Sequence, residues 1–123
     1  MQNKNLTFHS GLIVLIIILS GCGGIDFPDD KMEYIGYWKN DNMFIHIHES
    51  GMVNYERQKG LTHTEINMPI KEFEGDDFIV GALFIKTKFV VNKPPYNDNG
   101  IWKMTIDSTE VIRVEATSPS LTQ

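Results

Sequence analysis

Cys22 and the pair His46 and His48 are the residues of this chain whose types and spacing could do chemistry. Two imidazoles that are two residues apart on a strand point to the same side, where they could hold a metal ion. Zinc would need a further protein ligand, for which Glu56 across a hairpin or His63 is available. Two histidines without a spaced third ligand also fit a solvated strand face, so we predict no metal site. His46 and His48 are the residues to which a metal ion would bind if this prediction were wrong.

The remaining acidic and hydroxyl side chains indicate no catalytic group. Acid pairs such as Asp29–Asp30 and Asp76–Asp77 lie in segments rich in turn residues, where aspartate bonds the local backbone. The sequence contains no glycine-rich phosphate loop and no Gly-x-Ser-x-Gly motif, and Cys22 is its only cysteine. We therefore expect no catalytic residue and no enzymatic activity.

The chain begins with a short apolar segment. Lys4 is the only formal charge before Asp26, and residues 11–19 carry no polar side chain. A helix needs about 20 apolar residues to cross the core of a bilayer. A positive start, a shorter apolar run and then small residues are typical of a secretory signal peptide. An ordinary signal peptide, or an anchor helix with a chance cysteine, is the alternative.

The end of the apolar segment, Leu19-Ser20-Gly21-Cys22, resembles the lipobox of bacterial lipoproteins. The resemblance implies that the thiol of Cys22 receives a diacylglycerol and that the signal peptide is cut just before it. Gly23 stands where an aspartate would imply retention in the inner membrane. We therefore expect a protein of the cell envelope, anchored by its lipid in the outer membrane and facing the periplasm, with no cofactor besides the lipid on Cys22.

Charge and size limit what the rest of the chain can be. Loss of residues 1–21 removes Lys4, which leaves 10 basic against 16 acidic residues and a net charge of −6. An acidic chain is a poor partner for nucleic acid. The sequence predicts four segments, which are a signal peptide (1–21), a lipidated cysteine with a flexible tether (22–32), one domain (33–115) and a polar tail (116–123). A short helical turn could begin at Pro28.

Apolar and polar residues alternate along most of the domain, as expected for strands with one buried face. Ile45 and Ile47 alternate with the two histidines, and Trp102, Met104 and Ile106 repeat at the same spacing. The pattern predicts seven to eight short antiparallel strands in an all-β meander barrel, or a sandwich.

Other local predictions concern the ends and bends of these strands. Pro69 should lie at an edge or a break, because it donates no ladder hydrogen bond. The stretch of residues 78–91 is too long for one ordinary strand, and Gly81 should bend it or form a bulge. The segment 92–100, with its two prolines, should be a rigid loop, and in the last strand Ile112 and Val114 should face inward.

Three resemblances concern the domain. Gly36-Tyr37-Trp38 resembles the Gly-x-Trp motif that opens the barrel of lipocalins, and this implies a carrier of a small apolar ligand. The stretch from "PIKEFEGDDFIVG" to "GIWKMTID" is similar to small uncharacterised bacterial lipoproteins, which implies no mechanism. "SGMVNY" resembles the Ser-Gly-x-x-Tyr loop of lysozyme-inhibitor lipoproteins, with one residue more and without their disulfide.

These observations favour a non-catalytic, membrane-anchored envelope lipoprotein whose β domain binds another envelope component, either a protein or the cell wall. The lipocalin-like carrier and the lysozyme-inhibitor type of binder are the alternatives. Tyr96 is the candidate partner contact, because it follows two prolines that lower the entropy that binding would remove.

Overall fold

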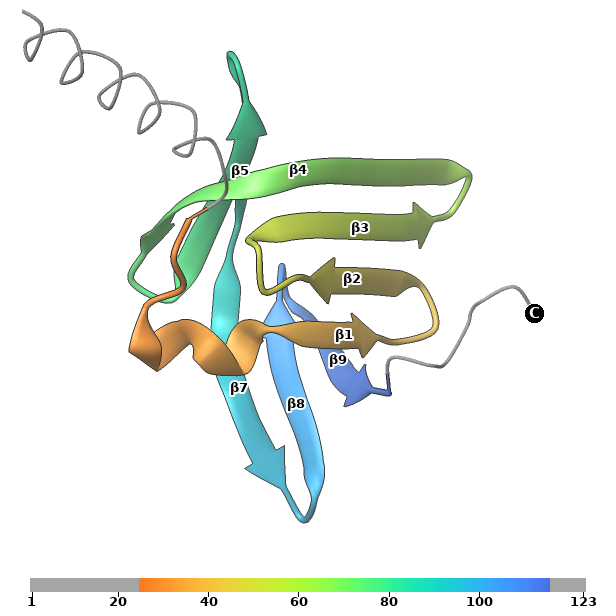
Figure 1. The fold of residues 1–123 in the computed structure, drawn as a ribbon. Helices are drawn as coiled ribbons and strands as arrows, with labels where there is room; N and C mark the ends of the chain where they lie inside the picture. Colours follow the sequence, from red (N-terminus) through yellow and green to blue (C-terminus); the bar gives the residue numbers. More distant parts are fainter. Residues whose placement is uncertain (1–24, 116–123) are drawn as a thin grey trace, which may run out of the picture.

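The computed structural model describes residues 25–115 as a short 3-10 helix followed by nine antiparallel strands (Figure 1). The predicted signal peptide, Cys22 and the polar tail lie outside the described residues. The elements are η1 (Asp29–Tyr34), β1 (Gly36–Lys39), β2 (Met43–Ile47), β3 (Met52–Lys59), β4 (Thr62–Glu74), β5 (Asp77–Ala82), β6 (Ile85–Phe89), β7 (Val91–Asp98), β8 (Ile101–Ile106) and β9 (Thr109–Val114). No helix within residues 25–115 is long and apolar enough to cross a membrane.

The strands form one curled sheet in the order β6-β5-β4-β3-β2-β1-β9-β8-β7. Each strand pairs with its neighbour in the chain, except that β9 returns to β1 and that β6 and β7 lie at opposite ends of the order. The curl brings β7 close to β5, since the backbone N–H of Val91 on β7 donates to Oδ1 of Asp77 on β5 at 2.8 Å. The prediction of an all-β antiparallel meander barrel is confirmed, in the form of a half-barrel (Figure 1).

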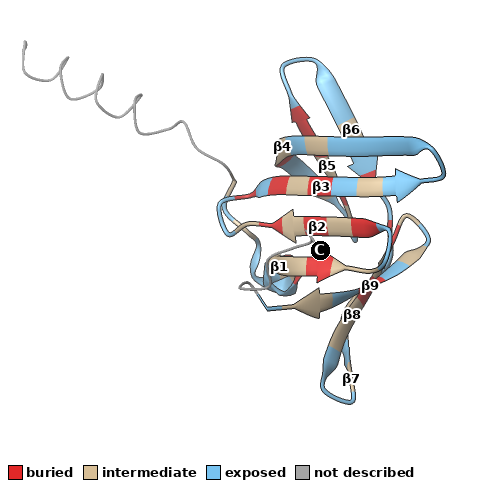
Figure 2. Ribbon diagram, turned by 90° about the vertical axis from the view of Figure 1, so that its right-hand side faces the viewer, coloured by how far each residue is buried: buried red, intermediate tan, exposed pale blue. Residues whose placement is uncertain are grey.

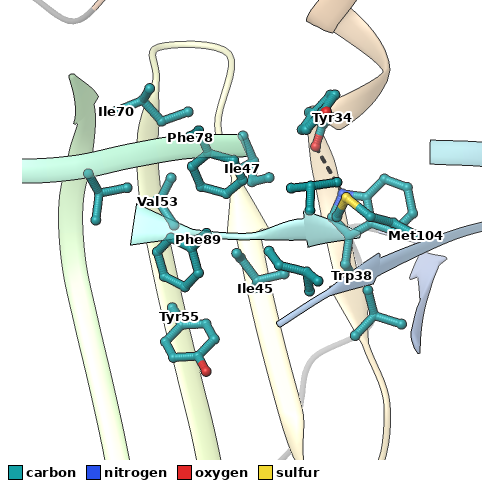
Figure 3. Packing of buried hydrophobic residues seen from close by; sticks show 14 of the residues in the cluster. Tyr34, Trp38, Ile45, Ile47, Val53, Tyr55, Ile70, Phe78, Phe89 and Met104 are labelled. Atoms are coloured by element: carbon teal, nitrogen blue, oxygen red, sulfur yellow. Dashed lines mark hydrogen bonds between the residues drawn. The ribbon is translucent and has the colours of Figure 1, made fainter. Parts of the chain in front are cut away.

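The concave side of the sheet holds the core. Alternation along β2 and β3 buries Ile45, Ile47, Val53 and Tyr55, as the sequence pattern predicts. Buried residues lie on both arms of the sheet (Figure 2) and meet in one cluster (Figure 3). The side chains that are less than 2% exposed are Trp38, Tyr34, Phe78, Phe89, Ile45, Ile47, Ile70, Met104, Ile106, Val53, Val80 and Val111. Packed side chains therefore fill the interior of the half-barrel.

The structure has more strands than the seven to eight predicted, and β7 is one reason. The segment that we expected to be a rigid loop, 92–100, lies mostly within β7. Pro94 and Pro95 are tolerated there because β7 is an edge strand, and the register shifts on both sides of Lys93. The loop prediction was wrong because an edge strand needs ladder hydrogen bonds on one side only.

The long stretch of residues 78–91 is also divided differently from the prediction. Gly81 lies inside β5, and the chain reverses at Leu83 and Phe84 between Ala82 and Ile85. A Cβ at Gly81 would contact the carbonyl oxygen of Ile85, so glycine allows the two strands to approach closely. The predicted bend is therefore a hairpin turn two residues later.

Pro69 lies where β4 changes partner. Its residues up to Pro69 pair with β3, and those from Ile70 onward pair with β5. A residue without a backbone N–H suits this corner, because neither ladder continues through it.

The chain before β1 belongs to the packed domain. The helical turn expected from Pro28 is η1, with Asp29 and Asp30 in its first turn. Ile25 and Phe27 are partly buried against the core, and the ring of Phe27 lies 5.8 Å from that of Phe73. Two apolar side chains of the expected tether therefore pack against the core of the domain.

The last strand shows the opposite face to the one predicted. Val111 is fully buried, whereas Ile112 is 39% exposed. Val111 pairs with buried Met104, and Arg113 pairs with buried Trp38, so the odd-numbered residues of β9 face inward. The prediction that Ile112 and Val114 face inward was wrong. The inner face of β9 includes the charged residue Arg113, which an alternation of apolar and polar residues does not indicate.

The buried hydroxyl of Tyr34 makes the stability of the domain depend on pH. Its hydroxyl donates to the carbonyl oxygen of Asp76 at 2.8 Å. Burial raises the pKa of Tyr34 well above its usual value of 10.0, and the nearby carboxylates of Asp76, Asp77 and Asp30 raise it further. The folded state therefore favours the protonated ring, and the resulting stability is lost as the pH rises above the unfolded value of 10.0.

We expect Tyr34→Phe to cost about 0.5–1.5 kcal/mol at pH 8, which is the usual net value of one hydrogen bond. Above about pH 10 this difference should shrink and change sign, because only the wild type must keep a tyrosine protonated. Urea unfolding of both proteins at pH 8, 10 and 11 measures it. A difference that stays constant across this range would contradict the cause given for the raised pKa.

Candidate binding surface

A stack of three rings lies on the convex side of the sheet. The ring of His46 lies 3.7 Å from that of Tyr37 and 3.7 Å from that of His48, with interplanar angles of 16° and 30°. Phe44 extends the row, with its ring centroid 6.2 Å from that of Tyr37. The four side chains are half-buried.

The strand register explains why these rings meet. Tyr37 pairs with His46 across β1 and β2, and each alternates with buried residues of its own strand. When Trp38 and Ile45 enter the core, Tyr37 and His46 must point outward on neighbouring strands. His48 follows on the same side, two residues along the chain.

Hydrogen bonds extend the stack across β3 and β4. A ring nitrogen of His48, Nε2, lies 2.6 Å from Oδ1 of Asn54, and Nδ2 of Asn54 donates to Oδ1 of Asn67 at 2.7 Å. Burial lowers the pKa of His46, and the neighbouring His48 lowers it further. His46 therefore stays neutral at neutral pH, which favours close stacking of the two imidazoles.

A shallow hollow of about 620 Å³ lies beside the stack. Residues from β1, β2, the β2–β3 turn and the end of β9 surround it. They are Ile35, Gly36, Tyr37, His46, Ile47, His48, Glu49, Ser50, Arg113, Val114 and Glu115. The hollow thus combines ring edges with charges of both signs, which suits a polar surface of a partner.

Arg113 forms one wall of this hollow. Its guanidinium lies 4.8 Å from the ring centroids of both Trp38 and Trp102. Nη2 donates to the carbonyl oxygen of Glu33 at 2.5 Å. Within residues 25–115, Nε is buried without a hydrogen-bond partner. Gly36 leaves room for this side chain, since a Cβ there would lie 3.4 Å from Nε.

The histidine pair does not gather the further ligands that we considered. Glu56 pairs with Phe44 rather than with His46, and His63 lies on β4 beside Gln58, whose Oε1 is 3.2 Å from its Nδ1. Among residues 25–115, no three His, Cys, Asp or Glu side chains form a group that could hold a metal ion. Stacking of His46 on Tyr37 and His48, and the hydrogen bond between His48 and Asn54, hold the two histidines in place.

Tyr96 lies on the edge strand β7 instead of in a loop. It pairs with Lys103, its hydroxyl donates to Oε2 of Glu110 at 3.4 Å, and Nζ of Lys93 lies 4.5 Å from its ring centroid. The side chain is half-buried.

The register joins Tyr96 to the ring stack through one row of side chains. From Tyr96 the row passes through Lys103 on β8 and Ile112 on β9, and then through Lys39 on β1 to Phe44 on β2. Pairing places all five on the convex side of the sheet, which we call the outer row. The structure thus brings Tyr96 and the histidines onto one surface.

Sequence reasoning missed the roles of Tyr37 and Arg113. Tyr37 precedes a buried tryptophan, so alternation could have placed it on the outer face. Its stacking partner could not be read from the chain, because that depends on which strand lies beside it. The inward position of Arg113 follows only from the pairing of β9 with β1 and β8, and no local sequence signal indicates it.

Comparison with known proteins adds no assignment. No protein-family model, curated protein or solved structure matches this chain.

Proposed function

We propose that the protein is a non-catalytic envelope lipoprotein, anchored through a lipid on Cys22, whose β domain binds another envelope component. The observation that carries the proposal is the position of Cys22. It is the only cysteine, and it stands between glycines where the apolar segment ends. Because Gly23 follows it, we propose that the anchor lies in the outer membrane and that the domain faces the periplasm.

The described domain begins close to the proposed anchor. Ile25 is packed against the domain, with its Cγ1 3.4 Å from the position that a Cβ of Gly51 would take. Cys22 is three residues earlier, and three residues span about 10 Å when extended. The anchor would therefore hold the domain close to the membrane.

Two features support binding on the outer face. The interior is filled with side chains, which favours a surface contact over a ligand carried inside. The outer row and the ring stack form a surface of half-buried rings and charges, where tyrosine and arginine are common anchors of interfaces. We propose that this surface, with Tyr96 at its edge, contacts the partner.

Crosslinking in intact cells, followed by mass spectrometry, tests this function. We expect Tyr96→Ala to reduce capture of the partner about tenfold, as loss of one interface anchor can. Its melting temperature should change little, because a partly exposed cation–π contact is worth about 0.5–1 kcal/mol. Leu61→Ala, at a fully exposed position in the β3–β4 turn, is the matched control and should crosslink like the wild type.

Equal capture by Tyr96→Ala and the wild type would remove Tyr96 from the binding surface. If none of the three proteins captured a partner in the envelope, the proposed binding function would be wrong. A Tyr96→Ala variant that unfolds would instead show that Tyr96 supports the sheet edge.

A further inference from the structure

The turn between β5 and β6 exposes three consecutive large apolar side chains. Leu83 is 87% exposed, Phe84 is 89% exposed and Ile85 is 60% exposed. We call these three residues the β5–β6 tip. In Figures 1 and 2 this hairpin projects beyond β4, away from the body of the half-barrel.

The turn itself does not require these residues. A two-residue hairpin turn favours glycine, asparagine or aspartate, because at least one of its positions has a positive φ. Here Leu83 takes that position with φ 57°. A leucine at positive φ is unfavourable, and its exposed side chain stabilises no core. Strained, exposed apolar residues of this kind indicate a contact outside the domain.

The charges around the tip differ from those of the whole protein. The sequence has 16 acidic residues, yet residues 78–89, which lead to and from the tip, contain none and carry Lys86 and Lys88. Lys88 is paired with Glu74 at 3.1 Å, whereas Lys86 is exposed next to the tip. An apolar end with nearby lysines is complementary to the surface of a bilayer with anionic lipid.

The β5–β6 tip and Cys22 can extend by similar distances from one region of the fold. Ile25 lies 3.4 Å from the position that a Cβ of Gly51 would take. The carbonyl oxygen of Gly51 accepts a hydrogen bond from the N–H of Ile70 at 2.8 Å, and Ile70 pairs with Val80. The tip begins at Leu83, three residues beyond Val80, which is about 10 Å along a strand. Cys22 is three residues before Ile25 and has a similar reach of about 10 Å.

We propose that the β5–β6 tip inserts into the lipid surface of the membrane that anchors the protein. This inference rests on the proposed lipid at Cys22, because the equal reach of the two segments lets the acyl chains and the tip meet one membrane plane. The three apolar side chains enter the boundary between headgroups and acyl chains, to a depth of about 5–10 Å. Lys86 lies at the headgroups. Two contacts with the membrane fix the orientation of the domain, which a single attachment point would not.

Quenching by brominated lipid measures the insertion. Full-length protein with Phe84→Trp is purified with its lipid and reconstituted in vesicles of phosphatidylcholine and phosphatidylglycerol with brominated acyl chains. Leu61→Trp is the matched control, since Leu61 is 103% exposed at the tip of the β3–β4 hairpin, which points in another direction (Figure 1). Both variants keep Trp38 and Trp102, so their difference isolates the new ring. We expect quenching of F84W to exceed that of L61W about threefold.

The outcomes separate this inference from the proposed anchor. Mass spectrometry reads the lipid on Cys22 independently of fluorescence. Lipidated protein whose F84W and L61W signals are quenched equally would overturn the insertion and leave the anchor standing. Protein that carries no lipid would overturn the anchor and the insertion that depends on it. An F84W spectrum that shifts to the blue in native membranes, without quenching by brominated lipid, would place the tip against a protein and also overturn the insertion.

Discussion

Replacement of Cys22 by alanine is expected to abolish lipid attachment and to leave the precursor uncut or released from the membrane. The thiol is the acyl acceptor in the proposed mechanism, and alanine offers no nucleophile. Two or three acyl chains make a lasting anchor at about 0.8 kcal/mol per buried methylene, whereas the net negative charge of the chain gives it no overall attraction to anionic lipid. The expected effect is therefore a complete loss of membrane attachment.

Metabolic labelling with a radioactive fatty acid, followed by membrane fractionation, measures this effect. Ser20→Ala is the matched control, because it keeps a small residue two positions before the cysteine and should be labelled like the wild type. Equal label in Cys22→Ala and the wild type would contradict the lipobox interpretation. Label that is lost from both variants would show that the region before the cysteine tolerates less change than we assume.

Trp38→Ala is expected to destabilise the domain by about 3–5 kcal/mol, the usual cost of emptying a large core site. Trp38 is fully buried, and its Nε1 donates to the carbonyl oxygen of Tyr34 at 2.9 Å. Its ring also supports the guanidinium of Arg113. The substitution thus leaves a cavity, removes the donor to the Tyr34 carbonyl and takes one of two stacking rings from Arg113. Because small domains are stable by only about 5–15 kcal/mol, the variant could lose its fold at physiological temperature.

Trp102→Ala is the matched control for this prediction. Trp102 is half-buried and contacts the other side of Arg113, so its loss exposes less core and should cost less. Urea unfolding, monitored by circular dichroism, compares the stability of the two variants with that of the wild type. If Trp38→Ala unfolds at the same urea concentration as the wild type, the core does not depend on Trp38 in the way that its burial indicates.

Much of the fold could be predicted because a strand with one buried face carries its pattern in the chain. The alternation around Ile45 and Val53 determines which side chains enter the core, and it requires no knowledge of the neighbouring strand. β9 is the exception, because Val111 and Ile112 are both apolar and only the pairing with β8 decides between them. β7 was missed because prolines usually end strands, and only its place at the sheet edge makes them acceptable.

What the sequence determined by itself is local. The lone cysteine after a short apolar run, the alternating strands and the turn from Pro28 each depend on residues that are neighbours in the chain. The tertiary structure decided which distant residues meet. Tyr37 stacks on His46, Tyr96 joins the same outer face, and Leu83 becomes the end of a projecting hairpin. The physical reason is that alternation fixes the face of each side chain, whereas its neighbours depend on strand order and register, which the packing of the whole core selects.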